Sequence, residues 1–90
     1  KNIIYNKKII GSILIRKIDD GLLLDEIFIE KEYRNKGFGS SIIKNYVLDS
    51  DDNIYLWVYK DNIKAFNLYK KLGFKIKEET DSRYYMEYSK

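Results

Sequence analysis

The hydrophobic residues of the chain follow two periods. Short runs rich in Ile, Leu and aromatic residues, bounded by polar turns, predict strands over residues 3–5, 9–18, 22–29, 54–58, 74–78 and 83–88. Apolar residues spaced three or four apart predict two helices, one from Gly37 onward and one over residues 62–72. Their apolar stripes are Phe38, Ile42, Ile43, Tyr46 and Val47 in the first, and Ala65, Leu68, Tyr69 and Leu72 in the second.

Glycines and polar clusters separate these elements. Gly11 inside the second strand indicates a bulge or a close approach of another backbone. Gly73 directly after the second stripe predicts the end of that helix. The remaining turns and loops are predicted at residues 6–8, 19–21, 49–52 and 80–82.

The order of elements predicts a mixed α/β sheet. The third strand is apolar on both faces at its start, which is typical of a central strand. A helix joins it to the fourth strand, so these two strands should run parallel through a right-handed crossover, while the hairpins give antiparallel pairs. We expect residues 1–90 to form a single domain, because a chain of 90 residues can bury only one modest core.

Composition excludes several kinds of chemistry. The chain has no Cys and no His, which rules out disulfides, thiolate or imidazole metal sites, and Cys/His or Ser/His catalysis, and we expect no metal. The net charge of +3 is weak evidence for a nucleic-acid partner in a chain rich in Lys, Ile, Asn and Tyr, and none is expected. The longest apolar run is too short to cross a membrane, so we expect a cytoplasmic protein without a membrane partner.

The loop before the first helix has the features of an anion site. It carries Arg34, Lys36, Gly37 and Gly39, and it leaves the backbone N–H groups of residues 35–40 at the positive end of the helix dipole. Glycines let a ligand approach the backbone closely, so the loop suits a diphosphate, although a glycine pair also occurs for packing alone. A dinucleotide fingerprint fits poorly, because Ile42 stands where its third glycine would be.

Two segments together resemble a known family. IFIEKEYRNKGFGSSII, residues 27–43, resembles the Q/RxxGxG/A pyrophosphate loop of the GNAT superfamily of N-acetyltransferases. LWVYKDNIKAFNLYKKLGF, residues 56–74, resembles the NxxAxxLYxKxGF segment of the same family. The resemblance covers most of the chain from Leu22 onward. It implies an enzyme that moves an acetyl group from acetyl-CoA to an amine acceptor.

The resemblance implies a role for each matching position. The pantetheine arm should pair with residues 27–29, the pyrophosphate should lie on the amides of residues 35–40, and Asn62 should contact the arm or the thioester. Tyr69 is the expected catalytic residue, protonating the departing thiolate. The implied cofactor-binding residues are Ile27, Phe28, Ile29, Arg34, Asn35, Lys36, Gly37, Phe38, Gly39, Ser40 and Asn62.

Structural alternatives accompany these roles. Tyr69 also fits a core aromatic on the buried stripe of its helix, and Asn62 also fits a helix N-cap. Lys70 and Lys71 are either a solvated face or contacts to the 3′-phosphate of CoA. Seven residues turn a helix by about 700°, so Asn62 and Tyr69 share a face with a rise of about 10 Å and can line one groove.

The chain departs from the family in two respects. Members usually have a strand and two helices before the first hairpin seen here, about 40 to 60 residues of a domain of ~150, so the chain is a fragment, a reduced member, or one completed by a partner. Some relatives place a glutamate base where this chain has Trp57. Asp25, Glu26 and Glu30 are the remaining candidates, with ordinary surface carboxylates as the simpler interpretation.

The sequence therefore predicts a GNAT-like N-acetyltransferase acting by direct attack of an amine on acetyl-CoA. The alternative is a non-catalytic acyl-CoA-binding or interaction module. The first hairpin carries apolar residues on both faces, including Ile9, Ile10 and Leu14. Because large apolar patches mark interfaces, we expect either a homodimer or a covering N-terminal segment in the natural protein.

Overall fold

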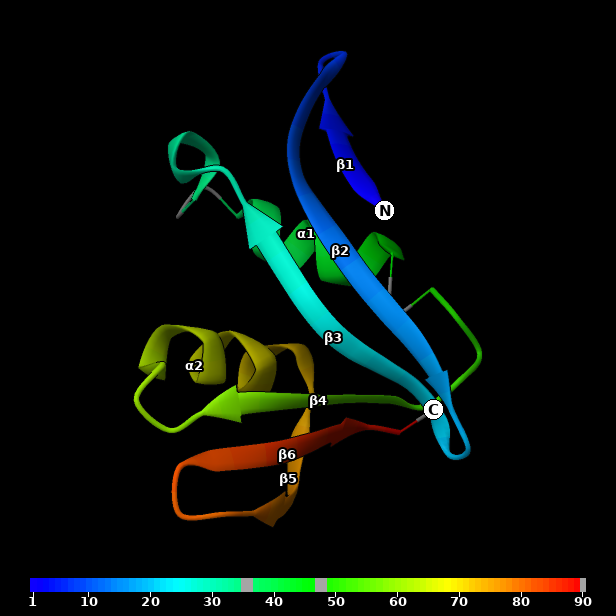
Figure 1. Cartoon of the computed structure of the whole chain (residues 1–90), viewed down its shortest axis with the longest axis vertical. Coiled ribbons are helices and arrows are strands. Elements are labelled where there is room, and N and C mark those ends of the chain that lie inside the picture. Colours follow the sequence, from blue (N-terminus) through cyan, green and yellow to red (C-terminus); the bar gives the residue numbers. More distant parts are fainter. Residues whose placement is uncertain (35–36, 47–48, 90) are drawn as a thin grey trace.

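The computed structural model describes residues 1–34, 37–46 and 49–89. Figure 1 shows a twisted sheet with two α-helices. In chain order the elements are β1 (Asn2–Tyr5), β2 (Lys8–Ile18), β3 (Gly21–Ile29), the 3₁₀-helix η1 (Lys31–Tyr33), α1 (Phe38–Tyr46), β4 (Ile54–Tyr59), α2 (Ile63–Leu72), β5 (Lys75–Glu79) and β6 (Arg83–Tyr88). All the predicted elements are present, and their predicted ends are shifted by at most one or two residues. The sequence did not predict η1. Val47, assigned to the first stripe, lies outside the described residues.

The sheet confirms the mixed topology expected from the sequence. Its strand order is β1-β2-β3-β4-β6-β5. β3 and β4 pair in parallel, and the other neighbouring strands pair antiparallel. β3 is a central strand, as its apolar start predicted.

The parallel pair is short, and this shapes the molecule. The ladder joins residues 22–24 of β3 to residues 54–56 of β4 and goes no further. β3 continues to Ile29 and β4 to Tyr59, so the second halves of both strands run apart from each other. Figure 1 shows the two strands diverging from their shared start, with α2 beside β4 and α1 behind β2 and β3. The sheet thus has a gap between two neighbouring strands.

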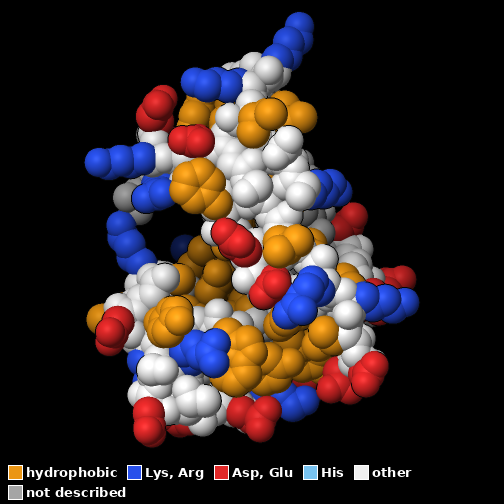
Figure 2. All heavy atoms as spheres, in the orientation of Figure 1, with side chains coloured by type: hydrophobic (Ala, Val, Ile, Leu, Met, Phe, Trp, Pro, Cys, Tyr) orange, Lys and Arg blue, Asp and Glu red, His pale blue; other side chains and the backbone are white. Residues whose placement is uncertain are grey.

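One face of the sheet holds the core, and we call the other the open face. The helices α1 and α2 cover the same side, where side chains such as Ile43, Ile54, Leu56, Phe74 and Met86 are at most 1% exposed. The open face carries half-exposed apolar side chains, and Figure 2 shows hydrophobic atoms gathered there over β4 and β6. By register with their strand partners they include Leu14, Phe28, Trp57 and Tyr59.

The turn and the strand crossing of the first hairpin account for the residues found at positions 6, 7 and 11. Its turn has positive φ at Asn6 (50°) and Lys7 (65°), as a two-residue hairpin with the right-handed twist of its strands requires. A bulge lies between Ile3 and Ile4, where β1 faces the region of Gly11. A Cβ at Gly11 would collide with the carbonyl oxygen of Phe28. The close backbone approach expected at Gly11 is confirmed, and the bulge lies beside it, at Ile10.

Self-association remains a prediction. Ile4 and Ile9 on the first hairpin are 61% and 55% exposed, which is unusual for isoleucines in a strand pair. We expect the sedimentation coefficient to rise with concentration between about 10 and 500 µM, and an Ile9→Lys variant to suppress that rise. A single monomeric species over the whole range would contradict this expectation.

None of the helices within the described residues is long and apolar enough to cross a membrane. The cytoplasmic location expected from the sequence stays a prediction.

Candidate functional site

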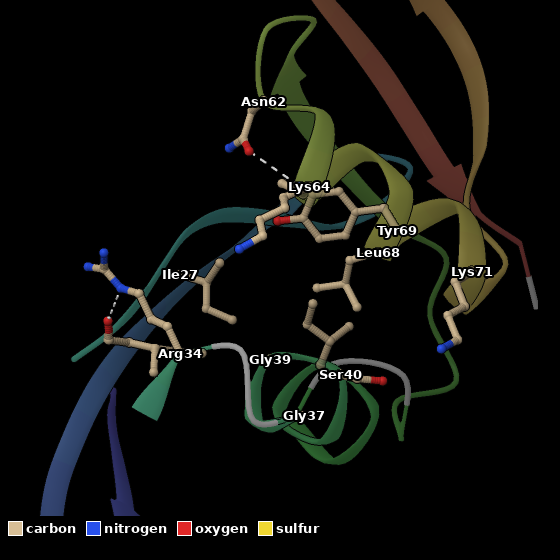
Figure 3. A pocket seen from close by; sticks show the side chains of 13 residues that line it. Ile27, Arg34, Gly37, Gly39, Ser40, Asn62, Lys64, Leu68, Tyr69 and Lys71 are labelled. Atoms are coloured by element: carbon tan, nitrogen blue, oxygen red, sulfur yellow. Dashed lines mark hydrogen bonds between the residues drawn. The ribbon is translucent and has the colours of Figure 1, made fainter. Parts of the chain in front are cut away.

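The gap between β3 and β4 opens into a pocket of about 550 Å³ on the helix side of the sheet. Figure 3 shows the pocket between β3, the start of α1 and one face of α2. Eight residues expected from the sequence line it together: Ile27, Ile29, Arg34, Gly37, Gly39, Ser40, Asn62 and Tyr69. Asn35 and Lys36 lie outside the described residues. The two signature segments, far apart in sequence, therefore meet at one site.

The β3 edge presents free backbone groups to this pocket. The N–H of Ile13 donates to the carbonyl of Lys1 at 2.8 Å, so the backbone of Ile13 faces β1. Ile27 is paired with Ile13, and its own N–H and C=O therefore point away from β2 and toward the gap. The same alternation turns the backbone of Phe28 toward β2. Of the three positions expected to pair with a pantetheine arm, Ile27 and Ile29 have the required orientation.

The beginning of α1 forms the other end of the pocket. The first hydrogen bond within this helix runs from the N–H of Ser41 to the carbonyl of Gly37 at 3.2 Å. The N–H groups of residues 38–40 consequently have no partner within the helix, and the helix dipole adds partial positive charge there. Gly37 has φ of 81°, a left-handed conformation that favours glycine. This geometry suits an anion with several oxygens.

The side chain of Arg34 folds back onto the last residues of β3. Its Nε donates to the carbonyl oxygen of Ile29 at 2.8 Å, and its guanidinium lies 5.5 Å from the centre of the Phe28 ring. Figure 3 shows the guanidinium directed away from the pocket floor. Its charge therefore lies at the rim, and the carbonyl of Ile29 is already used.

Neither of the two expected phenylalanines turns its ring to the pocket. Phe28 is 43% exposed and points to the open face, by the register of its strand. Phe38 packs edge-on against Tyr5 and Tyr33, with ring centres 4.8 and 5.6 Å apart. For Phe38 the contribution to an anion site is limited to its backbone N–H.

Tyr69 is buried as a core aromatic would be, and it also lines the pocket. It is only 8% exposed and packs edge-to-face on Phe74 with ring centres 5.7 Å apart, so it belongs to the core. It also lines the pocket, and Figure 3 shows its hydroxyl directed into that space from α2. Burial raises the pKa of Tyr69 above its ordinary value of 10.0, so the phenol stays protonated at neutral pH.

Asn62 is the N-cap of α2. Its Oδ1 accepts a hydrogen bond from the N–H of Ala65 at 3.3 Å, as the capping interpretation predicted. The capping bond uses the amide oxygen, which leaves the side-chain NH₂ as a donor beside the pocket. Capping and ligand contact are therefore compatible here.

Sequence reasoning missed part of the lining. The additional residues are Ile43, Lys64, Ala65 and Leu68, and Lys71, which the sequence offered as a possible phosphate contact, also lines the pocket. The helical spacing from Asn62 could have indicated Ala65, because a position three residues further on shares its face. Ala65 and Leu68 had been assigned only to the core, while Lys64 and Lys71 bring two positive charges to the pocket.

Gly39 offers a test of the anion site. A Cβ there would meet Leu68 and Ile29 at 3.5 and 3.8 Å, which is ordinary contact, so the fold tolerates it. We expect Gly39→Val to weaken CoA binding at least tenfold, about 1.4 kcal/mol, because its methyl groups project into the pocket. Isothermal titration calorimetry measures this, with Gly39→Ala as the matched control and an expected loss of less than threefold. Equal affinity for CoA in Gly39→Val and the wild type would contradict the site.

Comparison with known proteins identifies the class. The model of the acetyltransferase (GNAT) family matches residues 3–74, and the chain belongs to this family. It is 35% identical over 63 residues to the spermine/spermidine N(1)-acetyltransferase of Bacillus subtilis (strain 168), a match that covers 64% of this chain and 41% of the relative. A probable spermine N(1)-acetyltransferase of Bacillus subtilis subsp. natto (strain BEST195) is 36% identical over the same length.

Solved structures share the fold. The PaiA N-acetyltransferase of Thermoplasma acidophilum, in complex with coenzyme A, superposes with a TM-score of 0.84 at 22% identity, over 99% of this chain and 58% of that one. Arabidopsis thaliana Naa50, in complex with the bisubstrate analogue CoA-Ac-MVNAL, gives a TM-score of 0.77 at 30% identity, over 96% of this chain and 69% of that one. The matches to the two Bacillus relatives each cover 41% of that relative, so the chain spans less than half the length of the curated relatives it matches.

Proposed function

We propose that this chain binds acetyl-CoA and is the cofactor-binding core of an N-acetyltransferase. The observation that carries the proposal is the gap between β3 and β4, which ends at the amino terminus of α1. An extended arm along β3 would meet the free backbone groups of Ile27, and a diphosphate beyond it would meet the amides of residues 38–40. Lys64 and Lys71 supply positive charge along the same pocket.

The proposed reaction is direct transfer. The amine nitrogen attacks the thioester carbonyl, a C–N bond forms, the C–S bond breaks, and the thiolate leaves. Tyr69 is the only residue assigned a catalytic role at the leaving group. A phenol whose pKa lies above 10.0 is a weak acid beside a thiol of pKa about 8.5, so Tyr69 stabilises the sulfur by a strengthening hydrogen bond.

The acceptor we favour is a polyamine. The support comes from the two curated relatives, whose names specify spermine or spermidine as the substrate of those proteins. Naa50 was solved with a CoA-peptide analogue, which makes peptide amines the second class to compare.

A non-catalytic acyl-CoA-binding module is the competing function. It is favoured by the bare open face, since the described residues provide no helix on that side of the gap. A chain of this kind would bind CoA through the same pocket and leave acetyl-CoA intact.

The test combines binding with turnover. Calorimetry should show CoA binding more tightly than adenosine, and thiol release from acetyl-CoA should depend on added amine. The panel contains spermidine, spermine, a peptide with a free amino terminus, a lysine peptide and an aminoglycoside. Binding without amine-dependent thiol release would support the module, and CoA binding no tighter than adenosine would contradict both functions.

A further inference from the structure

Two aromatic residues flank the anion loop, the stretch of chain between η1 and α1. Tyr33 ends η1 directly before the loop, and Phe38 begins α1 directly after it. Between them, the described residues Arg34 and Gly37 both line the pocket, as Figure 3 shows. The rings of Tyr33 and Phe38 meet edge-to-face with centres 5.6 Å apart. The two ends of the loop are therefore held together by a side-chain contact.

A third ring, from the first hairpin, joins this contact. Tyr5 is the last residue of β1, and its ring centre lies 4.8 Å from that of Phe38 and 6.3 Å from that of Tyr33, edge-on to both. Lys8, its partner across the hairpin, places its ammonium 5.9 Å from the centre of the Tyr33 ring. Edge-to-face geometry is a favoured arrangement of aromatic pairs. We call Tyr5, Tyr33 and Phe38 together the aromatic clasp.

The clasp lies outside the pocket, since none of its three side chains lines that space. Tyr33 and Phe38 are partly buried against the core, whereas Tyr5 is 44% exposed. Removing the Tyr5 ring should therefore cost the core little. The aromatic contacts that Tyr5 makes are with the two ends of the anion loop.

The loop backbone depends on how its ends are held. Gly37 is exposed, and a Cβ placed on it would meet no heavy atom within 4 Å, so this part of the loop stands clear of the rest of the protein. The N–H of Arg34 donates to the carbonyl of Lys31 at 3.3 Å, a contact within the η1 turn itself. The clasp is what connects both ends of the loop to the first hairpin.

We propose that Tyr5 is a positioning residue for the diphosphate of CoA: through the clasp it holds the loop and the start of α1 in the conformation that binds the anion. This inference rests on the proposed function. A site whose binding-competent conformation is populated only in part loses apparent affinity by that fraction. Loosening the clasp should therefore weaken CoA binding without removing any group that touches CoA. The first hairpin, which lies outside both signature segments, thereby contributes to cofactor binding.

The first test compares CoA affinities by calorimetry, at a temperature at which circular dichroism shows every variant to be folded. We expect Tyr5→Ala to weaken CoA binding at least about fivefold, and Tyr5→Phe, which keeps the ring, to change it less than about twofold. Tyr59→Ala is the matched control, because it removes a tyrosine that is 62% exposed on the open face, and it should leave CoA affinity unchanged. Tyr5→Leu keeps apolar cover without the ring contacts and should show the same loss as Tyr5→Ala.

The second test separates positioning of the loop from a general loss of structure. Pantetheine has the arm of CoA without its phosphates, and its weaker binding can be followed by NMR titration. We expect Tyr5→Ala to change pantetheine affinity less than about twofold, because the β3 edge does not depend on the clasp.

Three results would overturn the role of Tyr5: unchanged CoA affinity in Tyr5→Ala, equal losses for CoA and pantetheine, or no rescue by Tyr5→Phe. Each of them leaves wild-type CoA binding, and with it the proposed function, standing. A wild type that fails to bind CoA would overturn the proposed function and this inference with it.

Discussion

Replacing Tyr69 by Phe should lower kcat about 10² to 10³-fold, which corresponds to ~2.7–4.1 kcal/mol of transition-state stabilisation. The substitution keeps the ring and therefore its edge-to-face contact with Phe74. It removes the hydroxyl, and the hydrogen bond proposed for this group gains strength only as negative charge develops on sulfur. CoA affinity should change less than threefold, because that bond contributes little in the ground state.

The measurement is steady-state kinetics with a saturating amine, together with CoA calorimetry. Tyr84→Phe is a matched control, since Tyr84 packs on Phe66 of the same helix with ring centres 4.8 Å apart but does not line the pocket. Burial raises the pKa of Tyr69, so ionisation of this phenol should cause no loss of activity between about pH 7 and 9. A Tyr69→Phe variant that keeps kcat but melts earlier would make Tyr69 a core residue without a catalytic role.

Phe74→Ala should destabilise the fold by about 3–5 kcal/mol. Phe74 is 1% exposed and packs between Tyr69 and Tyr88, with ring centres 5.7 and 5.6 Å away. Its removal leaves a cavity directly beneath the expected catalytic ring. Domains of this size have only about 5–15 kcal/mol of total stability, so the variant should lie close to the unfolding threshold at 37 °C.

Thermal unfolding followed by circular dichroism tests this, and we expect the melting temperature to fall by at least about 12 °C. Ile76→Ala on the following strand is the control, because Ile76 is 43% exposed and should cost less than about 1 kcal/mol. A fall of under about 4 °C for Phe74→Ala would mean that the site relaxes around the missing ring and that Tyr69 does not depend on this support.

Periodicity along the chain is enough to predict the order and type of the elements. Period-two and period-3.6 patterns are local properties of the chain, and they identified six strands and two helices within the described residues. Local chemistry also gave the capping role of Asn62 and the close approach at Gly11, since each depends on a residue type and its immediate neighbours. η1 was missed because three residues, Lys31–Tyr33, carry no periodicity to detect.

The motifs likewise predicted most of the residues that line the pocket. Glycines and a basic residue before a helix indicated an anion site, and the spacing of Asn62 and Tyr69 placed them on one helical face. Both statements follow from backbone geometry within a single element.

The relations between elements depend on contacts that no local pattern encodes. Strand pairing stops after Leu24 and Leu56, and the resulting gap depends on two segments more than thirty residues apart in sequence. The guanidinium of Arg34 lies on Phe28 because the chain turns back at η1, which no linear motif specifies. A bulge at Asp25 reverses the side of the sheet that Glu26 faces, and this is a property of the register between β2 and β3. Residue type and spacing determine whether one segment forms a helix or a strand. Where a strand ladder stops, which side of the sheet a side chain faces and which residues share a pocket follow from the segments that pack against each other.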